Sequence, residues 1–115
     1  NASKNKINKL LKKYNINIFD RLDNGIYTVV GSSGGKISLG MQKIIVIVRG
    51  ILKQCKIIIF DEPLTSLDKT NKNKILEMIK KECNNKTVII ITHDTEIIPY
   101  CDKIIDFNKI NKTTT

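Results

Sequence analysis

The chain has 115 residues and a net charge of +9, which allow one small domain, or part of one, and exclude two domains with separate cores. Its 20 basic residues are almost all lysines scattered among Asn and Ile, without interleaved aromatic side chains, so we expect a solvated basic surface and no specific nucleic-acid partner. Three widely spaced cysteines and the lack of a leader or a long apolar run argue against a disulfide framework, a zinc site, secretion and a membrane span.

The first predicted element is an amphipathic helix near the start of the chain. Ser3 can cap this helix, which is expected to run to about Tyr14 with lysines on its outer side. Its inner side is expected to hold three apolar residues at helical spacing: Ile7, Leu10 and Leu11. A second short piece over 16–22 precedes the turn 23–25, whose Asn-Gly pair readily supplies positive φ angles.

The loop over 29–36 contains a glycine-rich stretch that ends in Gly35 and Lys36. This stretch invites comparison with the phosphate-binding pattern GxxxxGK[ST]. Val30 stands where the first Gly of that pattern belongs, and Ile37 stands where Ser or Thr would ligate Mg²⁺. We therefore expect no phosphate-binding loop in this segment.

From Ser38 onward, the pattern predicts two longer helices. Ser38 is a candidate N-cap for a helix of roughly fifteen residues, and a second helix is expected from Asp68 to about Cys83. The first helix clusters four apolar residues at three- and four-residue spacings: Ile44, Ile45, Val48 and Leu52. The second is expected to turn three apolar residues inward: Ile75, Leu76 and Ile79.

Three apolar runs predict strands: the run that ends at Asp61, then 87–91 and 103–107. A short helix is expected near 95–100, and the polar tail 108–115 is expected to fray. Alternating strands and helices predict an α/β fold with a mostly parallel sheet.

The first predicted strand ends in two adjacent carboxylates, Asp61 and Glu62, which an ordinary strand end has no reason to carry. The run resembles a Walker B site, in which a strand buried on both faces delivers its first acid to the carboxyl edge of the sheet. Asp61 would then hold Mg²⁺, and Glu62 would orient or deprotonate water. A buried strand followed by a solvated acidic turn is the alternative, and the run alone does not decide between the two.

Four short motifs resemble those of the nucleotide-binding domain of ABC-type ATPases. In chain order, they resemble the signature, the Walker B motif, the D-loop and the switch histidine: Ile37-Ser38-Leu39-Gly40-Met41-Gln42, Ile59-Phe60-Asp61-Glu62-Pro63, Ser66-Leu67-Asp68 and Thr92-His93-Asp94. Ser38 lies 23 residues before Asp61, and His93 lies 31 residues after Glu62, which are the separations expected of family members. The segment 19–31 resembles the one that precedes the signature in exporter-type members.

This resemblance implies a partial P-loop NTPase fold of three layers, with residues 1–115 as the C-terminal part of one ABC ATPase domain. Residues 1–37 would be the end of a helical subdomain and a loop, 38–54 the signature helix, and 55–115 the part from Walker B to a last strand. No Walker A motif, adenine platform or Q-loop Gln precedes the signature. We therefore expect this stretch alone to bind ATP weakly, not to hydrolyse it, and to be marginally stable, with a gap in its sheet before the last strand.

The resemblance also implies that the signature acts in trans. Ser38, Leu39, Gly40 and Met41 would contact the γ-phosphate of an ATP molecule held by a second ABC ATPase domain in a head-to-tail dimer. Leu39 and Met41 depart from the usual Gly and Gln, which adds bulk near the ligand. As a bare residue, Ser38 can equally be a simple helix N-cap.

The other motif residues take roles in the chemistry by the same resemblance. Glu62 would be the general base, and Asp61 would lie on the Mg²⁺ side, directly or through water. His93 would donate to the γ-phosphate and help to fix the attacking water, and Asp68 would contact the partner protomer. Without the motif spacing, His93 is an ordinary loop residue and Asp68 an ordinary N-cap.

The function implied by the resemblance is ATP hydrolysis coupled to transport through a transmembrane domain, at the cytoplasmic face of a membrane. Two alternatives stay open. The basic charge alone supports a soluble ABC-type ATPase that acts on nucleic acid. Leu39, Met41 and the missing Walker A motif support a degenerate, non-catalytic interaction module. The sequence does not set the transported substrate, the direction of transport, or a homodimer against a heterodimer.

Overall fold

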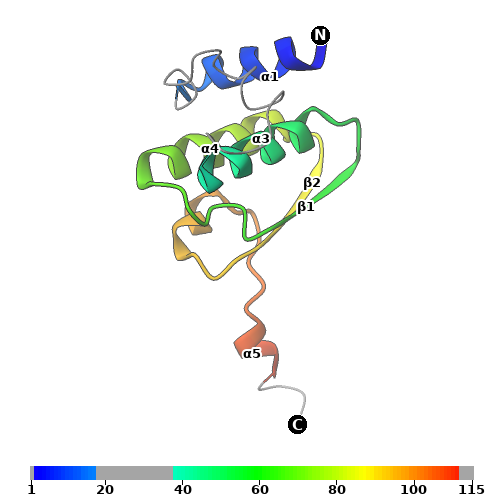
Figure 1. Cartoon of the computed structure of the whole chain (residues 1–115). Coiled ribbons are helices and arrows are strands. Elements are labelled where there is room, and N and C mark those ends of the chain that lie inside the picture. Colours follow the sequence, from blue (N-terminus) through cyan, green and yellow to red (C-terminus); the bar gives the residue numbers. More distant parts are fainter. Residues whose placement is uncertain (1, 18–37, 112–115) are drawn as a thin grey trace.

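The computed structural model describes residues 2–17 and 38–111 (Figure 1). The predictions for the turn 23–25, the loop 29–36 and most of the piece 16–22 lie outside these residues. In the described part, α1 lies over α3 and α4, and these two helices lie over the strands β1 and β2. This arrangement is an α/β fold with a parallel sheet, as predicted, and it is consistent with part of a P-loop NTPase domain.

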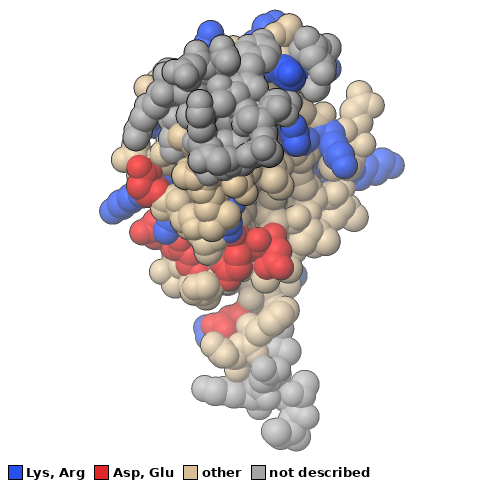
Figure 2. Space-filling model, in the orientation of Figure 1, with Lys and Arg blue, Asp and Glu red and all other residues tan. Residues whose placement is uncertain are grey.

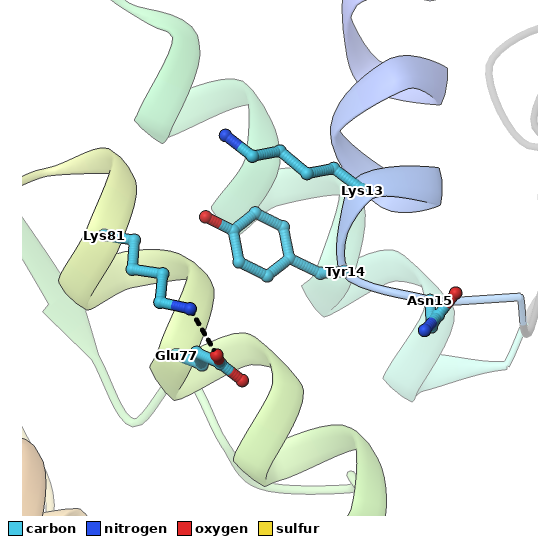
Figure 3. Close-up of a pocket in the computed structure, with 5 residues that line it drawn as sticks. All are labelled: Lys13, Tyr14, Asn15, Glu77 and Lys81. Atoms are coloured by element: carbon cyan, nitrogen blue, oxygen red, sulfur yellow. Dashed lines mark hydrogen bonds and ion pairs between the residues drawn. The ribbon is translucent and has the colours of Figure 1, made fainter.

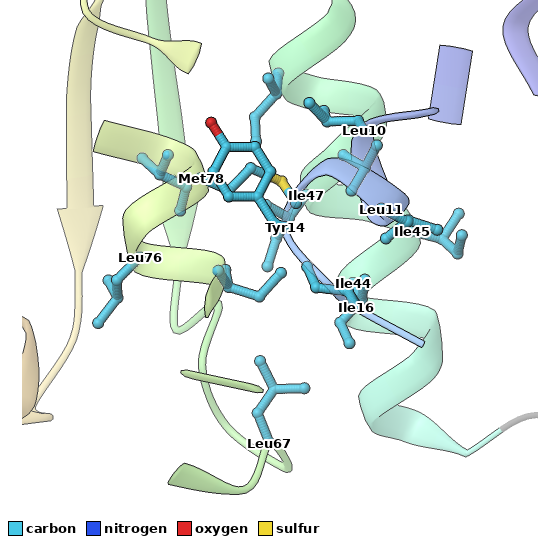
Figure 4. Packing of buried hydrophobic residues seen from close by; sticks show 14 of the residues in the cluster. Leu10, Leu11, Tyr14, Ile16, Ile44, Ile45, Ile47, Leu67, Leu76 and Met78 are labelled. Carbon is cyan, nitrogen blue, oxygen red and sulfur yellow. The ribbon is translucent and has the colours of Figure 1, made fainter. Parts of the chain in front are cut away.

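Helix α1 spans Ala2–Lys13 and begins slightly earlier than a cap at Ser3 would place it. Its predicted inner side is confirmed, because its three apolar side chains are all buried: Ile7, Leu10 and Leu11. The helix ends at Lys13, and Asn15 follows with a φ of 56°, in the left-handed region that is common after a helix end. Tyr14 then lies in the core between α1, α3 and α4 (Figure 4).

Helix α3 spans Leu39–Leu52, and α4 spans Lys69–Glu82. Both predicted N-caps are confirmed: Ser38 Oγ accepts a hydrogen bond from the backbone N–H of Met41 at 3.1 Å, and Asp68 Oδ1 accepts one from that of Asn71 at 2.8 Å. All predicted core residues of the two helices are buried except Leu52, which lies in the last turn of α3 and is exposed. The core is therefore mainly an arrangement of three helices packed on one side of the sheet.

Strands β1 (Ile57–Asp61) and β2 (Thr87–Ile91) pair in parallel from Ile57 opposite Thr87 to Asp61 opposite Ile91. The prediction that β1 is buried on both faces is wrong: Ile57 is 59% exposed and Ile59 is 61% exposed. Successive side chains of a strand point to opposite faces, and in the described residues helices cover only one of them. The apolar run indicates a strand but does not indicate whether one or both faces of that strand are covered.

The predicted last strand over 103–107 is also wrong. Residues 103–106 have no regular structure, and α5 spans Phe107–Asn111, where fraying was expected. A strand needs a neighbour to satisfy its backbone groups, and in the described residues β2 pairs with β1 alone. This segment instead leads away from the helices (Figure 1), with Ile104 and Ile105 exposed. Because the described residues contain no last strand, they also contain no gap in the sheet before such a strand.

The short helix predicted near 95–100 is confirmed as a 3₁₀ helix, η2, which spans Thr95–Tyr100. Asp94 caps it by accepting a hydrogen bond from the Glu96 backbone N–H at 2.9 Å. Among the residues described, every helix falls short of the length and apolar character that crossing a bilayer requires.

Candidate active site

The carboxyl ends of the two parallel strands bring Glu62 and Thr92-His93-Asp94 to the same edge of the sheet. The backbone N–H of Glu62 donates to the carbonyl of Ile91 at 2.7 Å, so the pairing continues one step beyond β1. At that step the chain turns sharply, because Glu62 has a φ of 47°. A left-handed conformation costs a residue other than Gly about 1 to 3 kcal/mol and persists where the surroundings fix it.

Both carboxylate oxygens of Glu62 accept hydrogen bonds from the residues that follow β2. His93 Nδ1 lies 2.7 Å from Glu62 Oε1, and the Thr92 hydroxyl donates to Glu62 Oε2 at 3.2 Å. The bond from His93, and then the bond from Thr92, holds the pKa of the Glu62 carboxyl below its ordinary value. Glu62 is therefore ionised at neutral pH and has a fixed orientation.

The contact with Glu62 also constrains the imidazole of His93. An ionised carboxylate only accepts hydrogen bonds, so Nδ1 must carry the hydrogen. The side chain is 86% exposed, which leaves Nε2 accessible from outside. Neutral His93 presents Nε2 as an acceptor, whereas the imidazolium presents it as a donor to an anion.

A second ion pair holds the loop after β2 to helix α4. Lys72 Nζ lies 2.8 Å from Asp94 Oδ2, and the backbone N–H of Asp94 donates to the Thr92 hydroxyl at 3.0 Å. The pKa of Asp94 is lowered, mainly by the hydrogen bond from Lys72, and the pKa of Lys72 is raised, mainly by the hydrogen bond to Asp94. The Thr92 hydroxyl is thereby aimed at Glu62.

The first turn of α3, which carries the signature-like residues, packs against the loop after β1. Ser38 and Leu39 are exposed, whereas Gly40 and Met41 are buried. A Cβ atom on Gly40 would lie 2.7 Å from the backbone carbonyl oxygen of Ser66, so only Gly allows this approach. The predicted contact of these four residues with phosphate stays a prediction, and Gly40 has a packing role that sequence reasoning missed.

Asp61 ends β1 on the exposed side of the same edge. The described residues give its carboxylate no hydrogen bond or ion pair, and they contain no cluster of three or more His, Cys, Asp or Glu residues placed to hold a metal. A lone carboxylate fits Mg²⁺, which usually takes one or two carboxylates and completes its shell with waters and phosphates. Asp68 acts here as the N-cap of α4, and its predicted contact with a partner stays a prediction.

Charge is unevenly distributed over this side of the molecule. Despite the net charge of +9, acidic side chains gather in a band below the helices in Figure 2, and basic side chains lie mainly above and beside it. Asp61 and Glu62 lie at the end of β1, and Asp94 follows the end of β2. Anionic ligands at this edge would therefore need cations or helix N-termini to offset the carboxylates.

A pocket of about 270 Å³ lies elsewhere, between the end of α1 and α4 (Figure 3). Beside it, the Tyr14 hydroxyl donates to Glu82 Oε2 at 2.5 Å, and Lys13 Nζ contacts the same oxygen at 2.9 Å. Burial, followed by the hydrogen bond to Glu82, raises the pKa of Tyr14, and the hydrogen bond from Tyr14 lowers the pKa of Glu82. These contacts join two helices and include none of the motif residues.

Sequence reasoning missed two lysines that contact the site. The sequence analysis gave no role to Lys72, which pairs with Asp94, or to Lys43, which contacts the loop after β1. Among 20 basic residues, no composition signal distinguishes these two. Position along the helix does not distinguish them either, because Lys69 and Lys74 lie in the same two turns of α4 as Lys72.

Comparison with known proteins identifies similar sequences. The family model for ABC transporters matches residues 1–65. ABC transporter ATM1 of Plasmodium falciparum is 42% identical over 87 residues, which is 76% of this chain and 8% of that protein. Leukotoxin export ATP-binding protein LtxB of Aggregatibacter actinomycetemcomitans is 38% identical over 88 residues, covering 76% of this chain and 12% of that protein.

An export ATP-binding/permease protein of Rickettsia typhi is 34% identical over 109 residues, which is 94% of this chain and 19% of that protein. The chain thus spans between 8% and 19% of the length of these curated relatives. The family match covers more than half of the chain, and the switch-like and Walker B-like motifs meet at one sheet edge. This chain belongs to the ABC transporter family and is exporter-like.

Proposed function

We propose that this chain is the C-terminal part of a nucleotide-binding domain in which ATP hydrolysis drives transport through a transmembrane domain, at the cytoplasmic face of a membrane. The observation that carries the proposal is the 2.7 Å contact between Glu62 and His93 at the carboxyl edge of a parallel sheet. Names of relatives that include export and ATP-binding support the same function. The exposed isoleucines of β1 fit a strand that belongs to a larger domain.

Within this proposal, Glu62 acts on the attacking water. Its lowered pKa keeps it anionic, and the bonds from His93 and Thr92 fix its orientation. Such a carboxylate orients water through hydrogen bonds and accepts its proton as the bond to phosphorus forms. As an imidazolium, His93 would donate from its exposed Nε2 to the γ-phosphate. Asp61 would hold Mg²⁺, directly or through water, and the ion would neutralise charge on the phosphates.

The signature residues and the D-loop acid would act on a second ABC ATPase domain in a head-to-tail dimer. Ser38 Oγ accepts the capping bond, so its own hydrogen can be donated to a phosphate oxygen. Leu39 is 57% exposed beside it, and the N-terminus of α3 favours an anion. Gly40 and Met41 would contribute from the same turn. Asp68 uses one carboxylate oxygen for its cap, and the other would reach the partner.

Residues 1–115 lack one of the phosphate-binding parts of such a domain. The printed sequence has no GxxxxGK[ST] loop, which supplies most of the backbone donors and the lysine for the phosphates in such domains. Residues 1–115 alone would therefore bind ATP weakly and would not hydrolyse it.

The test is Glu62→Gln in the full-length protein that carries this sequence. Gln keeps the shape of the side chain but cannot accept a proton, so kcat for ATP hydrolysis should fall by about 100-fold or more while ATP binding is retained. Glu77→Gln is the matched control, because Glu77 is a surface acid paired with Lys81 at 2.6 Å, away from the sheet edge. An unchanged steady-state ATPase rate in Glu62→Gln would remove Glu62 from the proposed role.

A further inference from the structure

The loop after β1 has a residue with a positive φ angle on each side of its turn. Glu62 has a φ of 47° and Ser66 a φ of 69°, and neither is Gly. Residues in this region are uncommon and persist only where neighbouring groups hold them. The side chain of Glu62 is held by the residues after β2 and its backbone N–H by the Ile91 carbonyl, so holding its backbone carbonyl takes a separate contact.

Lys43, in the second turn of α3, makes that contact. Its half-buried ammonium group donates to the backbone carbonyl of Glu62 at 2.8 Å and also bonds the hydroxyl of Thr65. The Thr65 hydroxyl in turn donates to the same Glu62 carbonyl at 3.3 Å. One cation therefore ties the start of the turn to its middle.

Helix α3 also fixes the far side of this turn. The close approach of Gly40 to the Ser66 carbonyl places the first turn of the helix directly against the second residue of positive φ. The two contacts come from the same face of α3, three residues apart, which is the spacing of neighbours on a helix. The carbonyl of Glu62 is held toward α3, and its carboxylate is held toward the end of β2.

We propose that Lys43 is a positioning residue for the reaction: by holding the backbone carbonyl of Glu62, it keeps the Glu62 carboxylate on His93 and Thr92. This inference rests on the proposed function, because the orientation of Glu62 affects the rate only if Glu62 acts on the attacking water. The bonds of Lys43 that the structure shows go to the Glu62 carbonyl and the Thr65 hydroxyl. Its effect is transmitted through the backbone of one residue.

Lys86 provides a matched control within the same fold. Its Nζ donates to two backbone carbonyls, those of Ile51 and Lys53, each at 2.7 Å. These acceptors lie at the C-terminal end of α3, away from the loop after β1. Lys86→Met therefore removes a lysine with an equal number of oxygen partners and leaves Glu62 untouched.

The experiment measures kcat and KM for ATP in the full-length protein with Lys43→Met, Lys43→Arg or Lys86→Met, together with hydrogen exchange of the segment 60–68. Lys43→Met should lower kcat by about 10- to 100-fold, because a small misplacement of a catalytic group has this effect. KM should stay within about twofold of the parent value, since the bonds that are removed go to the Glu62 carbonyl and the Thr65 hydroxyl. Exchange in 60–68 should become faster. Lys43→Arg should restore most of kcat, because guanidinium can donate to both oxygens.

Parental kcat in folded Lys43→Met, or an equal loss of kcat in Lys86→Met, overturns the inference. If Lys43→Met does not fold, Thr65→Val decides, because it removes the shared hydroxyl and keeps the side-chain shape. We expect a smaller fall in kcat with KM unchanged, and parental kcat in this variant overturns the inference. Glu62→Gln distinguishes a failure of the proposed function from a failure of this inference. If kcat is unchanged in Glu62→Gln, the proposed function fails. If kcat falls strongly in Glu62→Gln but stays parental in Lys43→Met, this inference alone fails.

Discussion

Each end of helix α3 makes contacts through one lysine and one glycine, but the two ends hold different structures. At the N-terminal end, Lys43 and Gly40 contact the loop 62–66, whose backbone includes two residues of positive φ. At the C-terminal end, Lys86 bonds the carbonyls where the helix stops, and Gly50 lies against side chains of β1. One end therefore fixes a loop that carries the candidate base, and the other fixes regular structure in the core.

The two glycines show how this difference arises. A Cβ on Gly40 would meet the backbone carbonyl of Ser66 at 2.7 Å, and a backbone group cannot move without moving the loop. A Cβ on Gly50 would meet the terminal methyl group of Ile58 at 3.0 Å, which can shift by rotating its side chain. The site end of the helix therefore tolerates less change than the core end, although both are close-packed.

The largest expected effect that tests this comparison is that of Gly40→Ala. Forcing the loop away should lower the free energy of unfolding by about 1 to 3 kcal/mol and lower kcat for ATP hydrolysis by about 100-fold, because Glu62 moves with the loop. Gly50→Ala should change stability by less than about 1 kcal/mol, since the better helix propensity of Ala offsets the shift of Ile58. Thermal unfolding and steady-state ATPase of the full-length protein measure both. Equal effects of the two substitutions would break the comparison.

A smaller effect is expected from Lys72→Met, which acts on the site from α4. The lowered pKa of Asp94 stabilises the fold at pH values above the ordinary carboxyl pKa of about 4, and this contribution is lost as pH falls through the lower folded-state pKa. The raised pKa of Lys72 gives a contribution that is lost only at alkaline pH.

The difference in stability between the parent protein and Lys72→Met should therefore be largest near neutral pH and should vanish in acid. Unfolding midpoints measured across this pH range test the prediction. A constant difference at all pH values would show that the Lys72–Asp94 pair does not stabilise the loop after β2 through its charge.

Local patterns in the sequence predicted the elements that hold the site. The caps at Ser38 and Asp68 follow from side chains that accept backbone N–H bonds, and the edge shared by Glu62 and His93 follows from parallel strands. Three features depend on neighbours that such patterns do not describe. A continuous apolar run does not reveal that one face of β1 is uncovered, and the segment 103–107 has strand composition without a strand to pair with.

The third feature is the contact between Lys43 and the Glu62 carbonyl, which joins residues 19 positions apart through a lysine and a backbone atom. A backbone acceptor has no sequence signal, because every residue carries one. Only the fold shows which lysine reaches it. The same reason explains why the packing role of Gly40 was missed.

If Glu62 and His93 act as one unit at the sheet edge, a double-mutant cycle in the single-turnover rate shows it most directly. Single-turnover ATP hydrolysis would be measured in the full-length protein for Glu62→Gln, His93→Ala and the double variant. Because the two side chains contact each other at 2.7 Å, the double variant should be within about threefold of the slower single variant. Effects that multiply independently in the double variant would contradict the account.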